Sequence, residues 1–432
     1  MKFTIYTLGC KVNQYESQAV SELFQKNGFA LVGEKETPDI VFINSCSVTA
    51  ESDRKTRQAV RRYRAKYPNA GIVLMGCMTS AHPETADELP EADIIIGNKN
   101  HEALLLKVNE FLTERKRLVE IEKHERNECY HTPAITDFSE HTRAFMKIED
   151  GCDRYCTYCI IPYARGFVRS RNLESIKDEA QALAQNGYKE IVLVGINLSS
   201  YGKDNGLNLY DAVKAVAEVS GIARVRLGSL EPDLMTDELL QNLSGVDKFC
   251  PHFHLSLQSG CDETLKRMNR RYDSAFYYDL VTRIRAIFKD AAITTDIMVG
   301  FAGETEEEFA KSLAFAKKVG FASAHIFAYS RRIGTAADKM SGQVENAEKQ
   351  RRSQKMIALT KQSEAEFLEK FIGSTVKVLA ETVEGDWVSG YTPNYLAVSF
   401  KGDGTLCGKL LNIKIISAEN DRLIGEITNV RN

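Results

Sequence analysis

Residues 151–166 read GCDRYCTYCIIPYARG and place three cysteines, Cys152, Cys156 and Cys159, within eight positions of one another. They follow AFMKIED (144–150), a short apolar run that predicts a β-strand. Thiolates are soft ligands that favour zinc or iron–sulfur clusters. A structural zinc site needs four closed ligands, and no fourth Cys or His follows nearby. The spacing therefore favours a four-iron cluster with one open iron over a zinc site completed by a distant residue.

Strands and helices alternate along the chain from this cysteine-rich stretch onward. Apolar runs that predict strands lie at residues 144–150, 190–197, 223–232, 252–260, 292–301 and 323–330. Helix-like segments separate most of them, at residues 175–187, 210–221, 274–290 and 306–320. Thr305 and Glu308 are spaced as a capping box for the last helix. Six strands in this alternation predict a partly closed parallel barrel of the (β/α)6 type, with ligands at the carboxyl ends of its strands.

The first 100 residues repeat a strand-then-helix pattern that predicts a doubly wound parallel sheet within an overall α/β fold. Strand candidates lie at residues 3–9, 39–45, 71–76 and 92–97, and helix candidates at residues 14–28, 51–68 and 101–116. Cys10, Cys46 and Cys77 each directly follow a strand candidate. Because the carboxyl ends of parallel strands lie along one edge of a sheet, these three thiols can converge on a second cluster. The alternative is three buried structural cysteines, since free cysteine is often buried.

The rest of the chain divides into segments that differ in composition. Residues 121–141 are polar and predict a linker, and a charged helical stretch spans residues 343–370. After Gly373, short β-like runs at residues 374–383, 395–400 and 410–419 predict a small antiparallel β-barrel. The predicted domains are an N-terminal domain (1–120), the linker (121–141), the parallel barrel (142–370) and the small barrel (371–432).

Net charge, hydropathy and missing motifs exclude several classes of function. The 432 residues carry a formal net charge of −3, so a nucleic-acid surface must be a local basic patch. No apolar run of about 18 residues and no signal-peptide pattern is present, which favours a cytoplasmic protein with no membrane contact. Phosphate-loop, zinc-protease and nucleophile-elbow motifs are missing, so kinase, zinc-protease and hydrolase functions have no support.

Several motifs in a fixed order make the chain resemble the radical S-adenosylmethionine methylthiotransferases along essentially its whole length. Besides residues 151–166, they are LGCKVNQYES (8–17), NSCSVT (44–49), GC (76–77), LVGINLSSYG (193–202), RLGSLEP (226–232), HLSLQSGCDETLKRMNRRY (254–272) and FAYSRRIGTAADKM (327–340). The resemblance implies an N-terminal methylthiotransferase domain, a central radical S-adenosylmethionine domain and a C-terminal β-barrel of the TRAM type.

The resemblance also implies the cofactors. Cys152, Cys156 and Cys159 would hold a 4Fe-4S cluster whose open iron binds S-adenosylmethionine, and electron transfer would release a 5′-deoxyadenosyl radical. Cys10, Cys46 and Cys77 would hold an auxiliary 4Fe-4S cluster that carries or donates sulfur. One S-adenosylmethionine would methylate that sulfur, and a second would activate the substrate C–H bond.

Three branches of the family modify different substrates. The segment LGCKVN (8–13) resembles the branch that adds a methylthio group to C2 of N6-threonylcarbamoyladenosine at position 37 of tRNA. The alternatives are the isopentenyladenosine branch, which typically reads GCQMN, and the branch that modifies an aspartate of a ribosomal protein, which reads GCPKN. From another class, the alternative is a non-catalytic RNA-binding iron–sulfur protein. The expected partners are the tRNA anticodon arm and an external electron donor, with no DNA.

Further candidate cofactor-binding residues lie beside the cysteines or at predicted strand ends. They are Tyr158, Gly195, Asn197, Ser229, Glu231, Gln258 and Arg271. Glycine permits close backbone approach to a ligand, hydroxyl, amide and carboxylate groups suit a ribose or an amino-acid moiety, and arginine suits a carboxylate. The alternative for each polar residue is ordinary hydrogen bonding at the mouth of a barrel.

Two basic segments are candidates for phosphate contact. The first contains Arg54, Lys55, Arg57, Arg61, Arg62, Arg64 and Lys66 on one predicted helix, and the second contains Lys266, Arg267, Arg270 and Arg271. The alternative for both is a solvated basic surface. The C-terminal barrel is not basic, so RNA contact there would depend on aromatic residues such as Trp387 and Tyr391.

Overall fold

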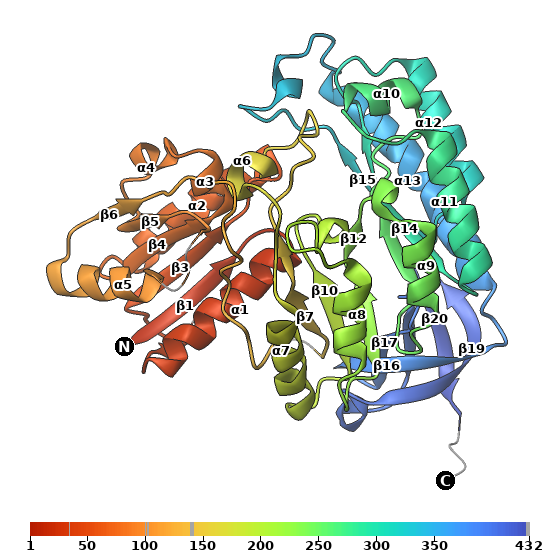
Figure 1. Cartoon of the computed structure of the whole chain (residues 1–432), viewed down its shortest axis with the longest axis horizontal. Coiled ribbons are helices and arrows are strands. Elements are labelled where there is room, and N and C mark those ends of the chain that lie inside the picture. The colour runs from red at the N-terminus through yellow and green to blue at the C-terminus, as the bar shows by residue number, and fades with distance from the viewer. Residues whose placement is uncertain (34, 100, 102, 139–141, 429–432) are drawn as a thin grey trace.

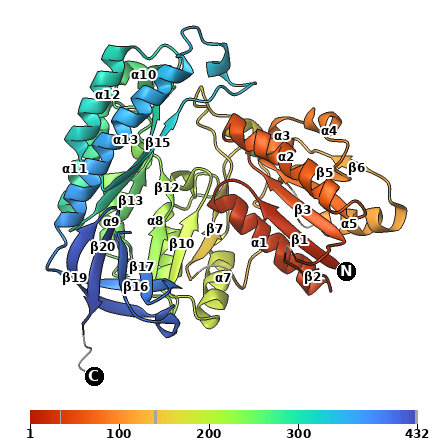
Figure 2. The ribbon, with the colours of Figure 1, turned by 180° about the vertical axis from the view of Figure 1, so that it is seen from behind.

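The structure is a computed structural model, and it describes residues 1–33, 35–99, 101, 103–138 and 142–428. Figures 1 and 2 show the N-terminal sheet on one side of the molecule, the parallel strands of the central barrel beside it, and the C-terminal barrel below the latter. Within the described residues, no helix is both long and apolar enough to cross a bilayer.

The N-terminal sheet has six parallel strands in the order β2-β1-β3-β4-β5-β6. They are β1 (Lys2–Thr7), β2 (Ala30–Leu31), β3 (Ile40–Ser45), β4 (Gly71–Gly76), β5 (Ile94–Ile96) and β6 (Leu118–Glu120). The central strands are entirely buried, and the alternation along them feeds two separate apolar clusters, one on each face. The predicted doubly wound sheet is therefore present. The short edge strands β2 and β6 were not predicted, because two or three residues carry too little pattern.

Helices cover both faces of this sheet. They are α1 (Lys11–Lys26), α2 (Ala50–Lys66), α3 (Cys77–Ala81), α4 (Thr85–Glu88) and α5 (Ala103–Glu114). Phe24 of α1 and Val108 of α5 share a cluster with Phe42 of β3, whereas Val60 of α2 joins Ile43 on the other face. Helix α1 also packs against the central domain, since Val12, Tyr15 and Ala19 belong to its core.

The central domain contains all six predicted strands in two parallel sheets. One has the order β11-β10-β7 and the other β12-β13-β14-β15. The strands are β7 (Ala144–Lys147), β10 (Glu190–Val194), β11 (Arg224–Leu227), β12 (Ser229–Leu230), β13 (His252–Leu255), β14 (Ala292–Val299) and β15 (Ser323–Ala328). The third predicted run is split at Gly228, so β11 and β12 pair with different neighbours. The result is a partly closed barrel.

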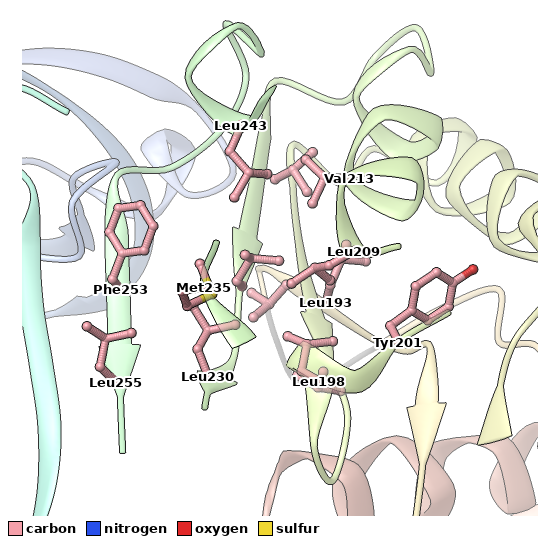
Figure 3. Close-up of a cluster of buried hydrophobic side chains, with 14 of the residues drawn as sticks. Leu193, Leu198, Tyr201, Leu209, Val213, Leu230, Met235, Leu243, Phe253 and Leu255 are labelled. Atoms are coloured by element: carbon pink, nitrogen blue, oxygen red, sulfur yellow. The ribbon is translucent and has the colours of Figure 1, made fainter. Parts of the chain in front are cut away.

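Helices bury one face of these sheets in a continuous apolar core. They are α7 (Leu173–Gln185), α8 (Leu209–Ala217), α9 (Asp237–Ser244), α10 (Asp262–Arg267), α11 (Ser274–Ile287), α12 (Glu306–Val319) and α13 (Asn346–Glu369). Figure 3 shows Leu193 of β10, Leu209 of α8 and Phe253 of β13 within this core. The predicted capping box of α12 is present, because Thr305 and Glu308 exchange hydrogen bonds, and Gly320 ends the helix in the left-handed conformation.

The C-terminal strands close into a barrel in the order β16-β17-β18-β20-β19. They are β16 (Thr375–Glu384), β17 (Trp387–Tyr391), β18 (Ala397–Lys401), β19 (Leu410–Glu419) and β20 (Arg422–Ile427). The prediction of a wholly antiparallel barrel is wrong in one pair, since β18 and β20 are parallel. A closed ring with an odd number of strands cannot alternate direction all the way round, so one parallel pair is required.

Three arginines attach this barrel to the amino ends of the central strands. Arg224 donates to the carbonyl oxygens of Lys377 (2.8 Å) and Tyr391 (2.9 Å). Arg226 donates to those of Pro393 (2.8 Å) and Thr392 (3.1 Å). Arg143 pairs with the carboxylate of Glu381 at 2.6 Å. The fully buried Glu190 binds Arg226 at 2.6 Å and balances part of this charge.

Residues 121–138 contain no helix or strand, yet their backbone is anchored. Thr136 and Asp137 donate their amides to the Glu22 carboxylate of α1, and Ile135 donates to Glu179 of α7. This segment therefore joins the first helix to the central domain through carboxylate–amide hydrogen bonds.

Candidate active site

The cysteines Cys10, Cys46 and Cys77 lie at the carboxyl ends of three adjacent strands, β1, β3 and β4. Strand order reverses between β1 and β3, which is where doubly wound sheets bind ligands. Gly9 has φ +109°, and an added Cβ there would lie 3.1 Å from the Cys46 sulfur, so the loops of Cys10 and Cys46 are in contact. Cys10 is exposed while Cys46 and Cys77 are buried. The structure thus brings the predicted triad together.

The second triad lies on the loop between β8 (Glu149–Asp150) and α6 (Ile161–Arg165). A short antiparallel pairing of β8 with β9 (Arg169–Ser170) brings the two ends of this segment together, and the Cys152 amide donates to the carbonyl of Gly166 at 2.9 Å. At its middle, the Thr157 amide donates to the carbonyl of Met268 at 3.1 Å. The loop is therefore fixed at its ends by β8 and β9 and at its centre by the segment after α10.

Neither triad is arranged for a single metal ion. Among the described residues, no group of three His, Cys, Asp or Glu side chains is close enough to hold one ion. A tetrahedral zinc site brings its ligands around one metal, whereas a 4Fe-4S cluster takes one thiolate on each iron and so keeps the sulfurs further apart. The soft chemistry of three thiols in each triad fits an iron–sulfur cluster.

An arginine contacts one cysteine of each triad. Arg165 donates from Nε to the Cys77 sulfur at 3.1 Å, and Arg270 donates from Nη1 to the Cys156 sulfur at 3.2 Å. Arg270 is also held by the Glu231 carboxylate at 2.6 Å. Such donors stabilise thiolates and bound sulfur and help to set cluster potentials.

Arg165 crosses the boundary between the two domains. It comes from α6, six residues after Cys159, yet its guanidinium lies between α1 and α3 of the N-terminal domain. It donates to Glu16 at 2.6 and 2.9 Å, to Asn13 at 3.1 Å and to Asp150 at 3.2 Å, and it is completely buried. Lys147 of β7 completes the network with 2.7 Å contacts to Glu16 and Asp150.

Electrostatics in this network favour the charged forms of its carboxylates. Burial acts to raise the pKa of Glu16, but Arg165 and Lys147 outweigh it and hold that pKa at about 2. The same cations hold the pKa of Asp150 well below its usual range against burial. Burial raises the pKa of the Cys77 and Cys159 thiols to about 12, so ligand binding must displace their protons.

This network predicts a loss of stability in acid. Because the pKa of Glu16 falls from 4.5 to about 2 on folding, its stabilisation is complete above pH 4.5 and disappears as the pH falls towards 2. The ionised Glu16 carboxylate is expected to contribute about 3 kcal/mol to the free energy of unfolding above pH 4.5. Urea unfolding of the apoprotein at pH 6 and pH 3 tests this, with the Glu16→Gln variant as the control. The prediction would be contradicted if the free energy of unfolding of wild type exceeded that of Glu16→Gln by the same amount at pH 6 and at pH 3.

The predicted cofactor-binding residues mostly surround the second triad. Gly195 lies so close to Glu149 that an added Cβ would be 2.5 Å from its carboxylate, and the Asn197 amide donates to Glu149 at 2.8 Å. Gln258 is buried with φ +67°, and Tyr158 packs edge-on to Phe301 at 6.4 Å. Ser229 is exposed at the start of β12. Arg271 is exposed as well, and the buried position beside Cys156 belongs to Arg270 instead.

Buried oxygens without hydrogen-bond partners lie at these strand ends. They are Oε1 of Glu149, Oδ1 of Asn197 and Oε1 of Gln258. Burial raises the pKa of Glu149 well above its ordinary value. Buried polar atoms normally find partners, and a bound polar molecule would supply them. These acceptor oxygens therefore fit the amino group and the ribose hydroxyls of S-adenosylmethionine, which donate hydrogen bonds.

Exposed apolar side chains surround the two cysteine sites. Tyr155, on the loop of the second triad, and Tyr163, on α6, pack edge to face at 5.8 Å. Across from them, Arg332 binds Ser47 at 2.5 Å and Asp53 at 2.6 Å, which leaves the neighbouring Ile333 and Val48 exposed. We call Val48, Tyr155, Tyr163 and Ile333 the rim.

The predicted basic helix is largely paired with acidic residues. On α2, Arg57 contacts Glu88 at 2.9 Å, Arg61 contacts Glu91 at 3.5 Å, and Arg64 pairs with Asp93. Arg54 and Lys55 share Glu51, while Arg62 lies over the rings of Tyr6 and Tyr63 and Lys66 over that of Tyr67. In the second segment, Arg267 binds Glu308 at 2.5 Å. These ion pairs reduce the charge available to a phosphate backbone.

Sequence reasoning missed the buried partners of the cysteines. Arg165 and Asn13 stand inside quoted motifs, but no role was assigned to them. Glu16, Asp150 and Lys147 carry no spacing signal, since they come from three different elements. A charged residue inside an otherwise apolar strand, such as Lys147 in AFMK (144–147), is the signal that was available.

Comparison with family models and known proteins agrees with this geometry. Residues 146–316 match the model of the radical SAM superfamily, and residues 2–97 match that of the uncharacterized protein family UPF0004. By fold alone, the chain resembles a radical S-adenosylmethionine methyltransferase, TsrM, from Kitasatospora setae, solved with cobalamin and a [4Fe-4S] cluster bound. The TM-score is 0.58 at 13% identity, over 78% of this chain and 74% of that one.

Relatives of similar length carry methylthio-related names. The threonylcarbamoyladenosine tRNA methylthiotransferase MtaB of Bacillus subtilis (strain 168) is 37% identical, over 96% of this chain and 93% of that protein. The tRNA-2-methylthio-N(6)-dimethylallyladenosine synthase of Clostridium botulinum (strain Loch Maree / Type A3) is 36% identical, over 98% and 96% respectively. With both cysteine triads in place and this similarity along nearly the whole length, the chain belongs to the radical S-adenosylmethionine tRNA methylthiotransferases.

Proposed function

We propose that this enzyme adds a methylthio group to C2 of N6-threonylcarbamoyladenosine at position 37 of tRNA. The observation that carries the proposal is the meeting of the two cysteine triads through Arg165, which follows one triad in sequence and contacts a sulfur of the other. Radical formation and sulfur transfer at one substrate carbon require two cofactor sites that face the same space, and the contact of Arg165 with Cys77 supports such an arrangement.

The proposal assigns one 4Fe-4S cluster to each triad. When bound, the clusters and S-adenosylmethionine supply a 5′-deoxyadenosyl radical, a methyl group and sulfur. Cys152, Cys156 and Cys159 hold the first cluster, while Glu149, Asn197 and Gln258 offer buried oxygens to the cofactor. Arg270 and Glu231 lie beside Cys156, where the guanidinium can bind the methionine carboxylate. Gly195 allows Glu149 to approach its backbone closely, which keeps the Glu149 carboxyl in position for the cofactor.

The N-terminal triad forms the sulfur-handling site in this proposal. Cys10 is exposed, so the edge of the site nearest to Cys10 is open to the space between the domains. Cys46 and Cys77 are buried, and their surroundings exclude water from the far side of the site. A reactive sulfur is thereby accessible from the substrate side alone.

The RNA surface in this proposal is the rim together with the C-terminal barrel. Aromatic and apolar side chains of the rim can stack on unpaired bases of the anticodon loop, which is a sequence-tolerant interaction. Trp387 of the barrel is exposed, with Lys401 over its ring at 4.3 Å. An external electron donor reduces the clusters, and the reaction takes place in the cytoplasm with tRNA.

Isopentenyladenosine is the second candidate substrate, because one of the similar proteins is named for the dimethylallyl nucleoside. Mass spectrometry of tRNA nucleosides after anaerobic turnover with S-adenosylmethionine and a reductant separates the two. Both tRNAs are offered together in one reaction. We expect a methylthio mass gain on the threonylcarbamoyl nucleoside alone. Gain only on the isopentenyl nucleoside would overturn the assignment, and gain on neither would exclude both tRNA substrates.

A further inference from the structure

A lysine beside the N-terminal triad faces the space between the domains with no acidic partner. Lys11 is the first residue of α1, immediately after Cys10, and both are exposed. Its ammonium lies 5.6 Å from the ring centroid of Phe145 on β7. Within the described part of the chain, this ammonium makes no hydrogen bond and no ion pair. An unpaired cation next to a reactive centre is a candidate for substrate contact.

The face that Lys11 approaches carries both apolar side chains and an arginine of the central strands. Phe145 is in register with Val192, and Val192 is in register with Arg226, so the three share one face. The groups that act electrostatically on the Lys11 ammonium are Tyr395, Arg143, Arg226 and Cys10. Positive charge therefore gathers on this side of the space between the domains.

The other cations of this group are already satisfied. Arg143 is paired with Glu381 at 2.6 Å and lies 5.1 Å from the ring centroid of Tyr395. Arg226 is paired with Glu190 at 2.6 Å and donates to two backbone carbonyls. The charge of Lys11 is thus the one in this group without a carboxylate, and the surrounding arginines make the position attractive to an anion.

We propose that Lys11 binds the carboxylate of the N6-threonylcarbamoyl group and thereby selects this nucleoside. The inference rests on the proposed function and names the residue that determines its substrate. The threonylcarbamoyl group ends in a carboxylate, which is ionised at neutral pH. The dimethylallyl group of the alternative substrate is an uncharged hydrocarbon, which would leave the ammonium unpaired and partly desolvated. Because Lys11 adjoins Cys10, it holds the N6 substituent beside the sulfur-handling site.

The test varies both the lysine and the substrate. Anticodon stem-loops carry either the threonylcarbamoyl group or its threoninol analogue, in which CH2OH replaces the carboxylate. For Lys11→Met we expect kcat/KM on the natural nucleoside to fall about 10- to 100-fold, the value of a hydrogen bond to a charged group. On the threoninol analogue the change is below threefold, and Lys11→Arg restores most of the activity on the natural nucleoside.

Two controls separate this role from a structural one. Iron content and reductive cleavage of S-adenosylmethionine without RNA should be unchanged in Lys11→Met. Lys26→Met, at the far end of the same helix, should behave as wild type on both substrates. Equal losses on both stem-loops, or no loss on either, would overturn the proposal.

If Lys11→Met fails to bind its clusters, a comparison of the two stem-loops with the wild-type enzyme alone still tests the proposal. Equal kcat/KM on the carboxylate and threoninol stem-loops would then overturn the inference, while a preference of at least tenfold for the carboxylate supports it. The failure of the proposed function looks different, because wild type would then modify neither the natural stem-loop nor its analogue.

Discussion

Replacing Arg165 with methionine is expected to destabilise the protein by about 3–5 kcal/mol, the usual cost of breaking a buried charge network from one side. Arg165 is completely buried, and its removal leaves Glu16 with Lys147, and Asp150 with Lys147 and Arg169, as buried cationic partners. Chemical unfolding of the apoprotein measures the loss. On the proposed assignment of a cluster to Cys10, Cys46 and Cys77, the same variant is expected to bind that cluster less tightly, because the Nε donor to Cys77 disappears.

Arg285→Met is the matched control for this experiment. Arg285 donates to the carbonyl oxygens of Val319 and Gly320 at the end of α12, with no carboxylate partner. We expect its replacement to cost about 1 kcal/mol and to leave both clusters intact. Equal destabilisation by the two substitutions would show that Arg165 contributes only an ordinary hydrogen-bonding side chain.

Alanine substitutions in the two triads are expected to separate radical formation from sulfur insertion. Cys156→Ala removes a ligand of the first site and should abolish 5′-deoxyadenosine formation. Cys46→Ala removes a ligand of the second site and should retain 5′-deoxyadenosine formation while producing no methylthiolated nucleoside. The reason is spatial, since the triads follow strands of different sheets, and among the described residues the Arg165 network joins them. Liquid chromatography with mass spectrometry quantifies both products in one anaerobic reaction.

Cys250→Ala is the control for the triad variants. Cys250 is fully buried at the amino end of the central strands, beside Arg226, and belongs to neither triad. Its replacement should leave both products close to wild-type levels. If Cys46→Ala also abolished 5′-deoxyadenosine, the two sites would not be independent in the way that the separate sheets indicate. If Cys156→Ala still formed it, the first triad would not be the radical site.

The sequence predicted the parts of the fold that repeat a local pattern. Each parallel strand of four or more residues, the capping box of α12 and the placement of Cys10, Cys46 and Cys77 at strand ends follow from period and turn chemistry. Short strands such as β2 were not predicted, because two residues are too few to show a periodic pattern. The parallel pairing of β18 with β20 was not predicted for a different reason. It follows from closure of the whole barrel, which no local sequence pattern encodes.

The sequence indicates the candidate cysteine ligands of the site. It does not indicate the buried arginines that contact those cysteines. Cysteine spacing identifies Cys152, Cys156 and Cys159 without any tertiary information. The choice of Arg270 over Arg271 depends on which of two neighbours turns inward after α10, and Asn269, with φ +60°, redirects the chain just before them. The Arg165 contact to Cys77 joins residues 88 positions apart, so only the packing of α6 against α3 reveals it.

The attachment of the C-terminal barrel has a consequence for how such enzymes diversify. Arg224 and Arg226 bind it through the carbonyl oxygens of residues 377 and 391–393, and every amino acid supplies a carbonyl. Side chains of the barrel other than Glu381, Tyr391 and Tyr395, which contact Arg143 or Arg226, can therefore change without altering these backbone contacts. New RNA preferences can evolve, or be exchanged between relatives, by substitution in this module while the catalytic domains keep their sequence.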